Sequence, residues 1–166
     1  GGGFGFGYSA MNYVGSQHTI IPGVSFPQGQ NAIENLIPVA RISDLLLRGG
    51  EPFDFNGFRY QYPETKLVYW AGGSPFHHHQ YLNLLMTSWH KPDTIIAHEW
   101  CWNSLAKRAD IVLPCTTTLE RQDIAMTPRD PYVVSMSKLI EPNGQARDDY
   151  DIFAGIAEEM GVGDAF

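Results

Sequence analysis

The fold is indicated most clearly by residues 66–80, which read Lys-Leu-Val-Tyr-Trp-Ala-Gly-Gly-Ser-Pro-Phe-His-His-His-Gln. A short apolar run ends there at Gly72-Gly73, and a helical pattern follows. In α/β proteins, a strand that stops at paired glycines and leads into a helix often holds a phosphate or nucleotide. Glycine lets the backbone approach the ligand, and the start of the helix offers N–H groups. Many such turns bind nothing, so the interpretation depends on the surrounding residues.

Apolar residues spaced by three or four predict three helices. The first expected helix runs from Pro38 to the Gly49-Gly50 stop, with Val39, Ile42, Leu45 and Leu46 on one face. The second covers 78–89, with Leu82, Leu85, Met86 and Trp89 on one face. The third covers 149–160, with Tyr150, Phe153, Ile156, Ala157 and Met160 inward. Residues 102–108 have room for one or two further helical turns.

Short apolar or alternating runs predict the strands, at 67–71, 94–98, 110–113 and 132–140, with a small hairpin over 53–62 around Asn56-Gly57. Strands and helices therefore alternate along the chain. This order predicts an α/β fold with a Rossmann-like open sheet, mostly parallel, and helices on both of its faces.

The domain organisation expected from the sequence is a single α/β cofactor-binding domain over residues 1–166. Residues 1–37 read as an irregular arm rich in glycine and aromatic residues, and residues 38–166 as the α/β core. The chain opens on three glycines without an initiator Met and stops at Phe166, soon after a helix-ending glycine. We therefore expect it to be excised from a longer chain.

Composition narrows the classes of function. Only 17% of the residues are charged and the net charge is −7, whereas a nucleic-acid surface needs clustered Lys and Arg. We therefore expect no nucleic-acid partner. No apolar run reaches the length of about 18 residues needed to span a membrane. Cys101 and Cys115 form neither a CxxC motif nor a disulfide framework, and no spacing indicates a catalytic triad.

His77, His78 and His79 raise the question of a metal site. Three adjacent residues at the start of a helix point in directions roughly 100° apart, so they cannot all bind one ion. We expect these imidazoles to donate hydrogen bonds to a phosphate or heterocycle instead, with Gln80 adding an amide. The alternative is that at least one of them is an exposed polar residue of a first helical turn.

Glu99 ends the second expected strand. Ligands of open parallel sheets lie beyond the carboxyl ends of the strands, where an acid can accept hydrogen bonds from a ribose or from the N–H edge of guanine. The turn after Gly73 is not the GxGxxG fingerprint, and Pro75 removes one N–H group. A related nucleotide site is therefore favoured over a classical NAD site.

Arg121 follows the third expected strand, in a loop that begins at Cys115. It could pair bidentately with a phosphate. It could equally form an internal salt bridge with Glu120 or Asp123, and the sequence leaves both readings open.

Four ordered motifs give the chain a family resemblance. They are Val-Tyr-Trp-Ala-Gly-Gly-Ser-Pro-Phe-His-His-His-Gln, Lys-Pro-Asp-Thr-Ile-Ile-Ala-His-Glu, Ala-Asp-Ile-Val-Leu-Pro-Cys-Thr-Thr-Thr-Leu-Glu-Arg-Gln-Asp and Gly-Gln-Ala-Arg-Asp-Asp-Tyr. The succession resembles the molybdopterin oxidoreductases, and within them the dimethyl sulfoxide, trimethylamine N-oxide and biotin sulfoxide reductases. The family usually has asparagine where this chain has Ser74, and an acid and an arginine where it has Tyr81 and Leu84.

The resemblance implies a bis(molybdopterin guanine dinucleotide) molybdenum cofactor in the parent enzyme, with this segment binding its dinucleotide arm. Cofactor contacts implied by motif are Gly72, Gly73, Ser74, His78, Gln80, His98, Glu99, Cys115, Thr117, Arg121 and Asp151, the last with Asp148 or Asp149 as alternatives. No segment matches the family's molybdenum-ligand motif, so we expect neither a metal ligand nor a catalytic residue in this chain.

The resulting hypothesis is a cofactor-binding domain of a molybdenum reductase that removes oxygen from S-oxides or N-oxides. Its partners would be the remaining domains of the parent reductase. We expect the isolated chain to carry no molybdenum and to be inactive. A bacterial periplasmic or cytoplasmic location stays open. The alternative is a stand-alone nucleotide-binding or regulatory module without redox activity, and an ordinary NAD dehydrogenase domain is disfavoured by Pro75.

Overall fold

The computed structural model describes residues 30, 33, 35–125 and 133–165. The chain divides into two compact units, one formed by residues 1–30 and 117–141 and the other by residues 31–116 and 142–166. The expected irregular arm at 1–37 falls almost entirely outside the described residues, so that part of the domain prediction stays a prediction. No helix of the described part is long and apolar enough to cross a membrane.

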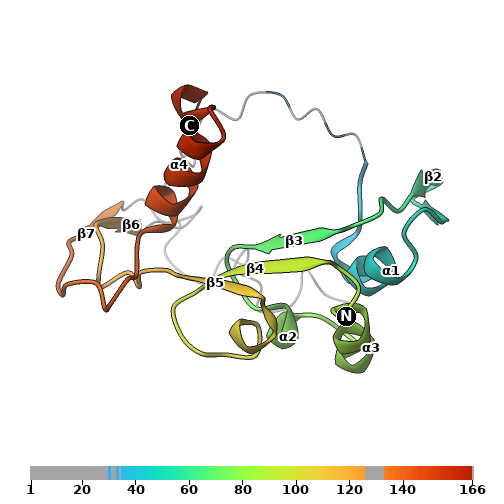
Figure 1. The fold of residues 1–166 in the computed structure, drawn as a ribbon, viewed down its shortest axis with the longest axis horizontal. Helices are drawn as coiled ribbons and strands as arrows, with labels where there is room; N and C mark the ends of the chain where they lie inside the picture. The colour runs from blue at the N-terminus through green and yellow to red at the C-terminus, as the bar shows by residue number, and fades with distance from the viewer. Residues whose placement is uncertain (1–29, 31–32, 34, 126–132, 166) are drawn as a thin grey trace, which may run out of the picture. The chain divides into compact units, whose positions relative to one another are not determined.

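The second unit is built on a parallel sheet of three strands, β3 (Leu67–Trp70), β4 (Thr94–Glu99) and β5 (Ile111–Pro114), in the order β3-β4-β5. Figure 1 shows β4 in the middle of this sheet. Two parallel pairings, Trp70 with Ala97 and Glu99 with Pro114, set the register at the carboxyl ends. The three central strands are therefore confirmed within a residue or two of their expected bounds.

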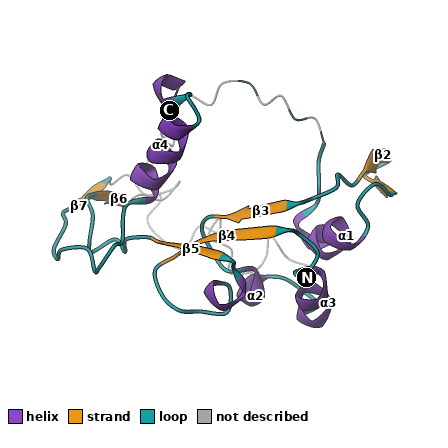
Figure 2. Ribbon diagram, viewed as in Figure 1, coloured by secondary structure: helices purple, strands orange, loops and turns teal. Residues whose placement is uncertain are grey.

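The single helix expected over residues 78–89 is wrong. The chain instead forms α2 (Pro75–His78) and, after a break, α3 (Leu82–Ser88), and the loop between them is visible in Figure 2. Tyr81 adopts the left-handed conformation, with φ of 53°, and a residue in that conformation cannot continue a right-handed helix. The apolar spacing correctly describes α3, but the histidines belong to the separate turn before it.

The core lies on one face of the parallel sheet. Its buried residues come from three helices, the central strand and the β4–β5 connection, and they are Leu46, Phe76, Leu85, Trp89, Ile95, Ala97 and Leu105. Of the four residues expected inward on the middle helix, Leu85 and Trp89 are buried, whereas Leu82 and Met86 are 41% and 38% exposed. The short helix after the break therefore presents a narrower apolar face than its sequence spacing indicates.

The opposite face of the sheet carries α4 (Asp149–Glu159). Tyr69 of β3 and His98 of β4 both have ring contacts with Phe153 of this helix, with ring centroids 5.6 Å and 4.9 Å apart. The inward face expected for this helix is corrected in part, because Tyr150 and Met160 are 65% and 72% exposed. Only the middle of the expected stripe is covered.

The amino-terminal elements of this unit are a short helix and a hairpin. Val39–Arg41 forms the 3₁₀ turn η1, which continues into α1 (Ile42–Leu47), and Val39 is exposed rather than packed as expected. The hairpin of β1 (Pro52–Phe55) and β2 (Phe58–Gln61) is confirmed as an antiparallel pair. A 3₁₀ turn, η2 (Ala106–Arg108), precedes β5, and η3 (Gly163–Ala165) follows α4.

The first unit contains the antiparallel pair β6 (Asp123–Ala125) and β7 (Val134–Met136). The strand expected over 132–140 is therefore short, and it forms a separate two-stranded sheet instead of extending the parallel one. A mixed α/β fold with one parallel sheet is what the described residues establish.

Candidate functional site

The candidate site is the carboxyl edge of the parallel sheet, where three segments end at one level. Trp70 pairs with Ala97, so Gly72 and Glu99 each lie two residues beyond a paired position. The N–H of Cys115 donates to the carbonyl of Glu99 over 3.2 Å, which joins the end of β5 to the end of β4. The structure thus places the glycine turn, Glu99 and Cys115 along the same edge.

The Gly72-Gly73 turn has the backbone conformation that favours glycine, with φ of 82° and 65°. A Cβ at Gly72 would meet nothing within 4 Å, and one at Gly73 would meet only the His78 ring, at 3.8 Å. The indole Nε1 of Trp70 donates to the carbonyls of both glycines, over 3.0 Å and 2.9 Å. Trp70 therefore holds the turn, a role that the sequence reasoning missed although the residue lies only two positions before it.

Two buried polar atoms at this edge have no hydrogen-bond partner among the residues that the structure describes. They are Oγ of Ser74 and Oε1 of Glu99, in residues that are 7% exposed each. An unpartnered buried polar group costs about 1–3 kcal/mol, so each such group calls for an explanation. Ser74 follows β3 and Glu99 ends the neighbouring strand β4, and both were expected to contact a cofactor.

The anion site expected here combined a glycine turn with free N–H groups at the start of a helix, and the helix start offers few such groups. Helix α2 has only four residues, Pro75 occupies its first position, and the N–H of His77 already donates to the carbonyl of Ser74. What remains is the glycine turn and the unpartnered atoms beside it.

The three histidines have different surroundings. His77 and His78 are exposed, while the His79 ring packs edge-on against Trp70 with centroids 5.7 Å apart. Gln80 is exposed as well. No group of three or more His, Cys, Asp and Glu residues in the described part of the chain is arranged to hold a metal ion.

His98 is not oriented as a simple ligand contact. Its side chain is 1% exposed, and both ring nitrogens are occupied within the protein. Nε2 lies 2.6 Å from the hydroxyl of Tyr69, and Nδ1 lies 2.6 Å from Oδ1 of Asp149. A direct contact of His98 with a cofactor stays a prediction, and these bonds indicate that His98 links β3 to α4.

Residues 146–148 continue the carboxyl edge beyond β5. Cys115 and Arg147 form an isolated parallel bridge, in which the N–H of Thr116 donates to the carbonyl of Arg147 over 3.1 Å. The hydroxyl of Thr116 also donates to Asp148 over 2.7 Å. Of the three acids expected near the last helix, Asp148 and Asp149 are thus engaged inside the protein, whereas Asp151 is exposed.

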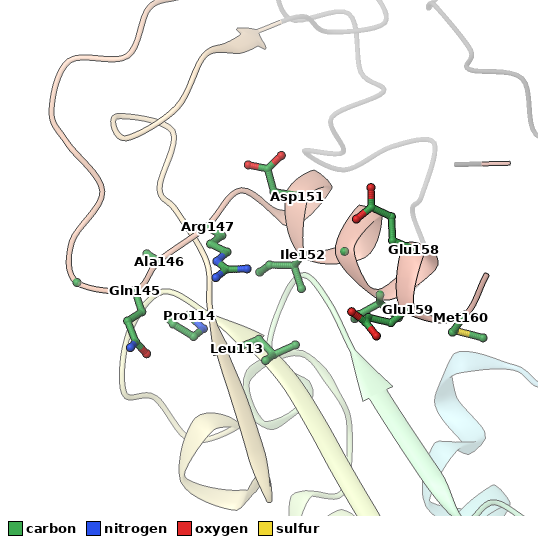
Figure 3. Close-up of a pocket in the computed structure, with 13 residues that line it drawn as sticks. Leu113, Pro114, Gln145, Ala146, Arg147, Asp151, Ile152, Glu158, Glu159 and Met160 are labelled. Atoms are coloured by element: carbon green, nitrogen blue, oxygen red, sulfur yellow. The ribbon is translucent and has the colours of Figure 1, made fainter. Parts of the chain in front are cut away.

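A pocket of about 940 Å³ lies between this edge and α4 (Figure 3). Its lining comes from the end of β5, the loop before α4 and α4 itself, and consists of Leu113, Pro114, Gly144, Gln145, Ala146, Arg147, Asp151, Ile152, Gly155, Ile156, Glu158, Glu159 and Met160. It combines apolar side chains with three acids and one cation. Sequence reasoning missed Arg147, although it belongs to the quoted motif Gly-Gln-Ala-Arg-Asp-Asp-Tyr.

Thr117 and Arg121 belong to the first unit, and their contact with a cofactor stays a prediction. The carboxylate of Glu120 accepts from the N–H and hydroxyl of Thr117, over 2.8 Å and 2.9 Å. Arg121 forms the internal salt bridge that the sequence left open, with Nε and Nη2 at 2.9 Å and 2.8 Å from Oδ2 of Asp123. The backbone N–H of Ile124 and the Arg121 guanidinium lower the pKa of Asp123 below its usual range.

Comparison with known proteins agrees with the quoted motifs. Over its whole length the chain is 46% identical to a biotin sulfoxide reductase from Cereibacter sphaeroides, of which it spans 22%. It is 46% identical over 80% of its length to a dimethyl sulfoxide/trimethylamine N-oxide reductase from Rhodobacter capsulatus, of which it spans 16%. Over 98% of its length it is 39% identical to a trimethylamine-N-oxide reductase from Haemophilus influenzae, of which it spans 21%. The chain therefore covers about a fifth of the length of these relatives.

A solved structure supports the fold alone. Acetylene hydratase from Pelobacter acetylenicus aligns with 63% of this chain and 14% of its own, at a TM-score of 0.56 and 22% sequence identity. The model of the family described as molybdopterin oxidoreductase matches residues 53–159, which include β2 to β7, all of β1 but its first residue, and the whole of α4. The matched residues carry the glycine turn, Glu99 and all of the pocket lining except Met160, and the chain thus belongs to the molybdopterin oxidoreductase family.

Proposed function

We propose that this chain is the part of a molybdenum S-oxide or N-oxide reductase that binds the guanine dinucleotide arm of a bis(molybdopterin guanine dinucleotide) cofactor. The observation that carries the proposal is the pair of buried, unpartnered atoms at the carboxyl edge, Ser74 Oγ and Glu99 Oε1. Family membership and the names of the relatives support the reductase assignment. The activity, the substrates and the other domains of the whole protein are part of the proposal.

The residues at the edge fit such a cofactor. A backbone turn of two glycines with open space above Gly72 gives a phosphate close access. The hydroxyl of Ser74 can donate to a phosphate or pterin oxygen, and the carboxylate of Glu99 can accept from the N1–H and N2–H groups of guanine. His78 and Gln80 add exposed donors beside the turn.

The remaining residues divide by charge. Asp151, Glu158 and Glu159 make the pocket rim acidic, which disfavours a pyrophosphate there and suits the donor edge of a base or pterin. Arg147 lines this pocket, and its bridge partner Cys115 bonds to Glu99 along the sheet edge. When bound, the cofactor would supply the oxygen-atom transfer and the electron storage at its molybdenum, and the protein residues bind and orient it.

We also propose that the three-stranded parallel sheet is part of a Rossmann-like open sheet with helices on both faces. Support comes from the core against α1–α3 on one face and from the α4 contacts of Tyr69 and His98 on the other.

Ser74→Ala and Glu99→Gln in the full-length reductase test the cofactor assignment. Each removes or neutralises a group with a buried atom that has no hydrogen-bond partner among the described residues, so neither should lower the stability of the cofactor-free protein. Cofactor retention should fall in both, on the order of 2–5 kcal/mol for Glu99→Gln, because the paired cofactor groups would lose their partner. The measurements are molybdenum content and GMP released by acid hydrolysis, beside urea denaturation of the cofactor-free form.

Glu64→Gln is the matched control, because Glu64 is exposed and precedes β3, whereas the candidate site follows the carboxyl end of that strand. Normal cofactor content in both site variants would refute the assignment. A titration of the isolated chain with NADH and with GMP separates our proposal from an ordinary NAD dehydrogenase domain. Binding of NADH without binding of GMP would favour a dehydrogenase domain over our proposal.

A further inference from the structure

Three side chains from three elements form a continuous hydrogen-bonded chain on the face of the sheet opposite the core. Tyr69 of β3 contacts Nε2 of His98, and Nδ1 of His98 contacts Asp149 at the first turn of α4, both over 2.6 Å. The His98 side chain is 1% exposed, while that of Asp149 is 46% exposed. The chain thus runs from the edge strand through a buried imidazole to a half-exposed carboxylate.

The bonding pattern assigns a direction to this chain. A carboxylate only accepts, so the Nδ1 of His98 carries a proton and donates to Asp149. In the neutral imidazole Nε2 then accepts, and the Tyr69 hydroxyl donates to it. Burial, and secondly the charge of Asp149, raise the pKa of Tyr69, which keeps that hydroxyl protonated and able to donate.

A second bridge of the same kind lies beside the first. The hydroxyl of Thr116, just beyond β5, donates to Asp148, the residue before Asp149. Consecutive carboxylates at the start of α4 are therefore bound to the ends of β4 and β5. Ring contacts of Phe153 with Tyr69 and His98 fill the space one helical turn further on.

We propose that Tyr69, His98 and Asp149 are positioning residues that hold the first turn of α4 against the carboxyl ends of β3 and β4. His98 precedes Glu99, and Asp149 lies two residues before Asp151. The hydrogen-bonded chain therefore sets the separation between the strand end that carries Glu99 and the helix turn that carries Asp151. The consequence for cofactor binding rests on the proposed function above, whereas the attachment of α4 does not.

Two substitutions of His98 separate its hydrogen bonds. The amide nitrogen of asparagine superposes on Nδ1 of histidine, so His98→Asn keeps the bond to Asp149 and loses the one to Tyr69. The amide group of glutamine superposes on Nε2, so His98→Gln keeps the bond to Tyr69 and loses the one to Asp149. Both variants lose the ring that packs against Phe153, which makes them matched controls for packing.

The assay is hydrogen–deuterium exchange of residues 149–160, measured by mass spectrometry in the cofactor-free full-length protein. His98→Gln should speed exchange in α4 at least roughly tenfold relative to His98→Asn, because it removes a hydrogen bond to a charged group. Asp149→Asn keeps an acceptor and should retain protection, while Asp149→Ala should lose it. Equal exchange in the two His98 variants, or equal loss in the two Asp149 variants, would overturn the positioning role.

Cofactor content tests the consequence for the site. His98→Gln and Asp149→Ala should lower the molybdenum and GMP content of the reductase, and His98→Asn and Asp149→Asn should restore it at least partly. Loosened α4 with full cofactor content would overturn the link to the site. Failure of the Ser74 and Glu99 variants, with α4 still loosened by His98→Gln, would refute the proposed function and leave the attachment of α4 standing.

Discussion

Alanine in the glycine turn should destabilise the protein without any steric clash. Gly72 and Gly73 have φ of 82° and 65°, a conformation that costs an L-residue about 1–2 kcal/mol. The space above Gly72 is open, and the nearest neighbour of a Cβ at Gly73 is at an ordinary contact distance of 3.8 Å. The penalty of Gly72→Ala is therefore conformational alone, about 1–2 kcal/mol less stability.

The same substitution in α4 provides a control of opposite sign. A Cβ at Gly155 also meets nothing within 4 Å, but this glycine has helical geometry within Asp149–Glu159. Gly155→Ala should stabilise the protein by about 0.5–1 kcal/mol, because alanine loses less backbone entropy on folding. Gly72→Asn should cost less than Gly72→Ala, because asparagine tolerates the left-handed conformation.

Urea denaturation of the four proteins, wild type included, gives the free energies of unfolding. The expected order of stability is Gly155→Ala, wild type, Gly72→Asn and Gly72→Ala. If Gly72→Ala were as stable as wild type, the turn would not have the left-handed conformation on which the phosphate-binding argument rests. An equal loss in Gly155→Ala would show instead that alanine is unfavourable for reasons unrelated to φ.

Two further predictions concern the core and the first unit. Leu85→Ala should cost about 2–5 kcal/mol of unfolding free energy because Leu85 is 1% exposed, while Leu82→Ala, at a site 41% exposed, should cost clearly less in the same urea assay. The Ile124 N–H and Arg121 lower the pKa of Asp123 in the folded protein. The ionised carboxylate therefore stabilises the folded protein at pH values above the pKa of an unfolded aspartate. This stabilisation is lost as the pH falls through the lower pKa that Asp123 has in the folded protein. The protection of residues 123–125 against hydrogen exchange, relative to the intrinsic rate at each pH, should therefore fall on acidification, and Asp123→Asn should remove that part of the pH dependence. Unchanged pH dependence in Asp123→Asn would contradict the assignment.

Local sequence signals predicted the elements of the parallel sheet well. The runs at 67–71, 94–98 and 110–113 are apolar and bounded by turn residues, which is how short buried strands read. The Asn56-Gly57 hairpin also follows from local chemistry, since both residues take positive φ. The family resemblance rested on the same ordered motifs and is confirmed by the match over residues 53–159.

The boundaries of the helices and their buried faces were harder to predict from the sequence. The periodicity of Leu82 and Leu85 indicates a helix but contains no signal for the left-handed Tyr81 that separates α2 from α3. Tyr150 and Met160 fit an inward stripe by spacing, yet whether a stripe is covered depends on elements distant in the chain. Residues 134–136 have the periodicity of a strand, but the sequence does not show that this strand pairs with β6, because strand pairing is set by the tertiary structure.

For the candidate site, sequence alone determined which residue types stand at the ends of the strands: paired glycines, a serine, a glutamate and a cysteine. Tertiary structure decided which of them have partners. His98 was indistinguishable from Glu99 as a ligand candidate in sequence, because both end the same strand. Successive strand residues face opposite sides of a sheet, so His98 meets Tyr69 and Asp149 on one side, while Oε1 of Glu99 is buried without a partner in the described part of the chain. Hydrogen-bond partners 29 and 51 residues away in the chain are set by packing, and no local pattern encodes them.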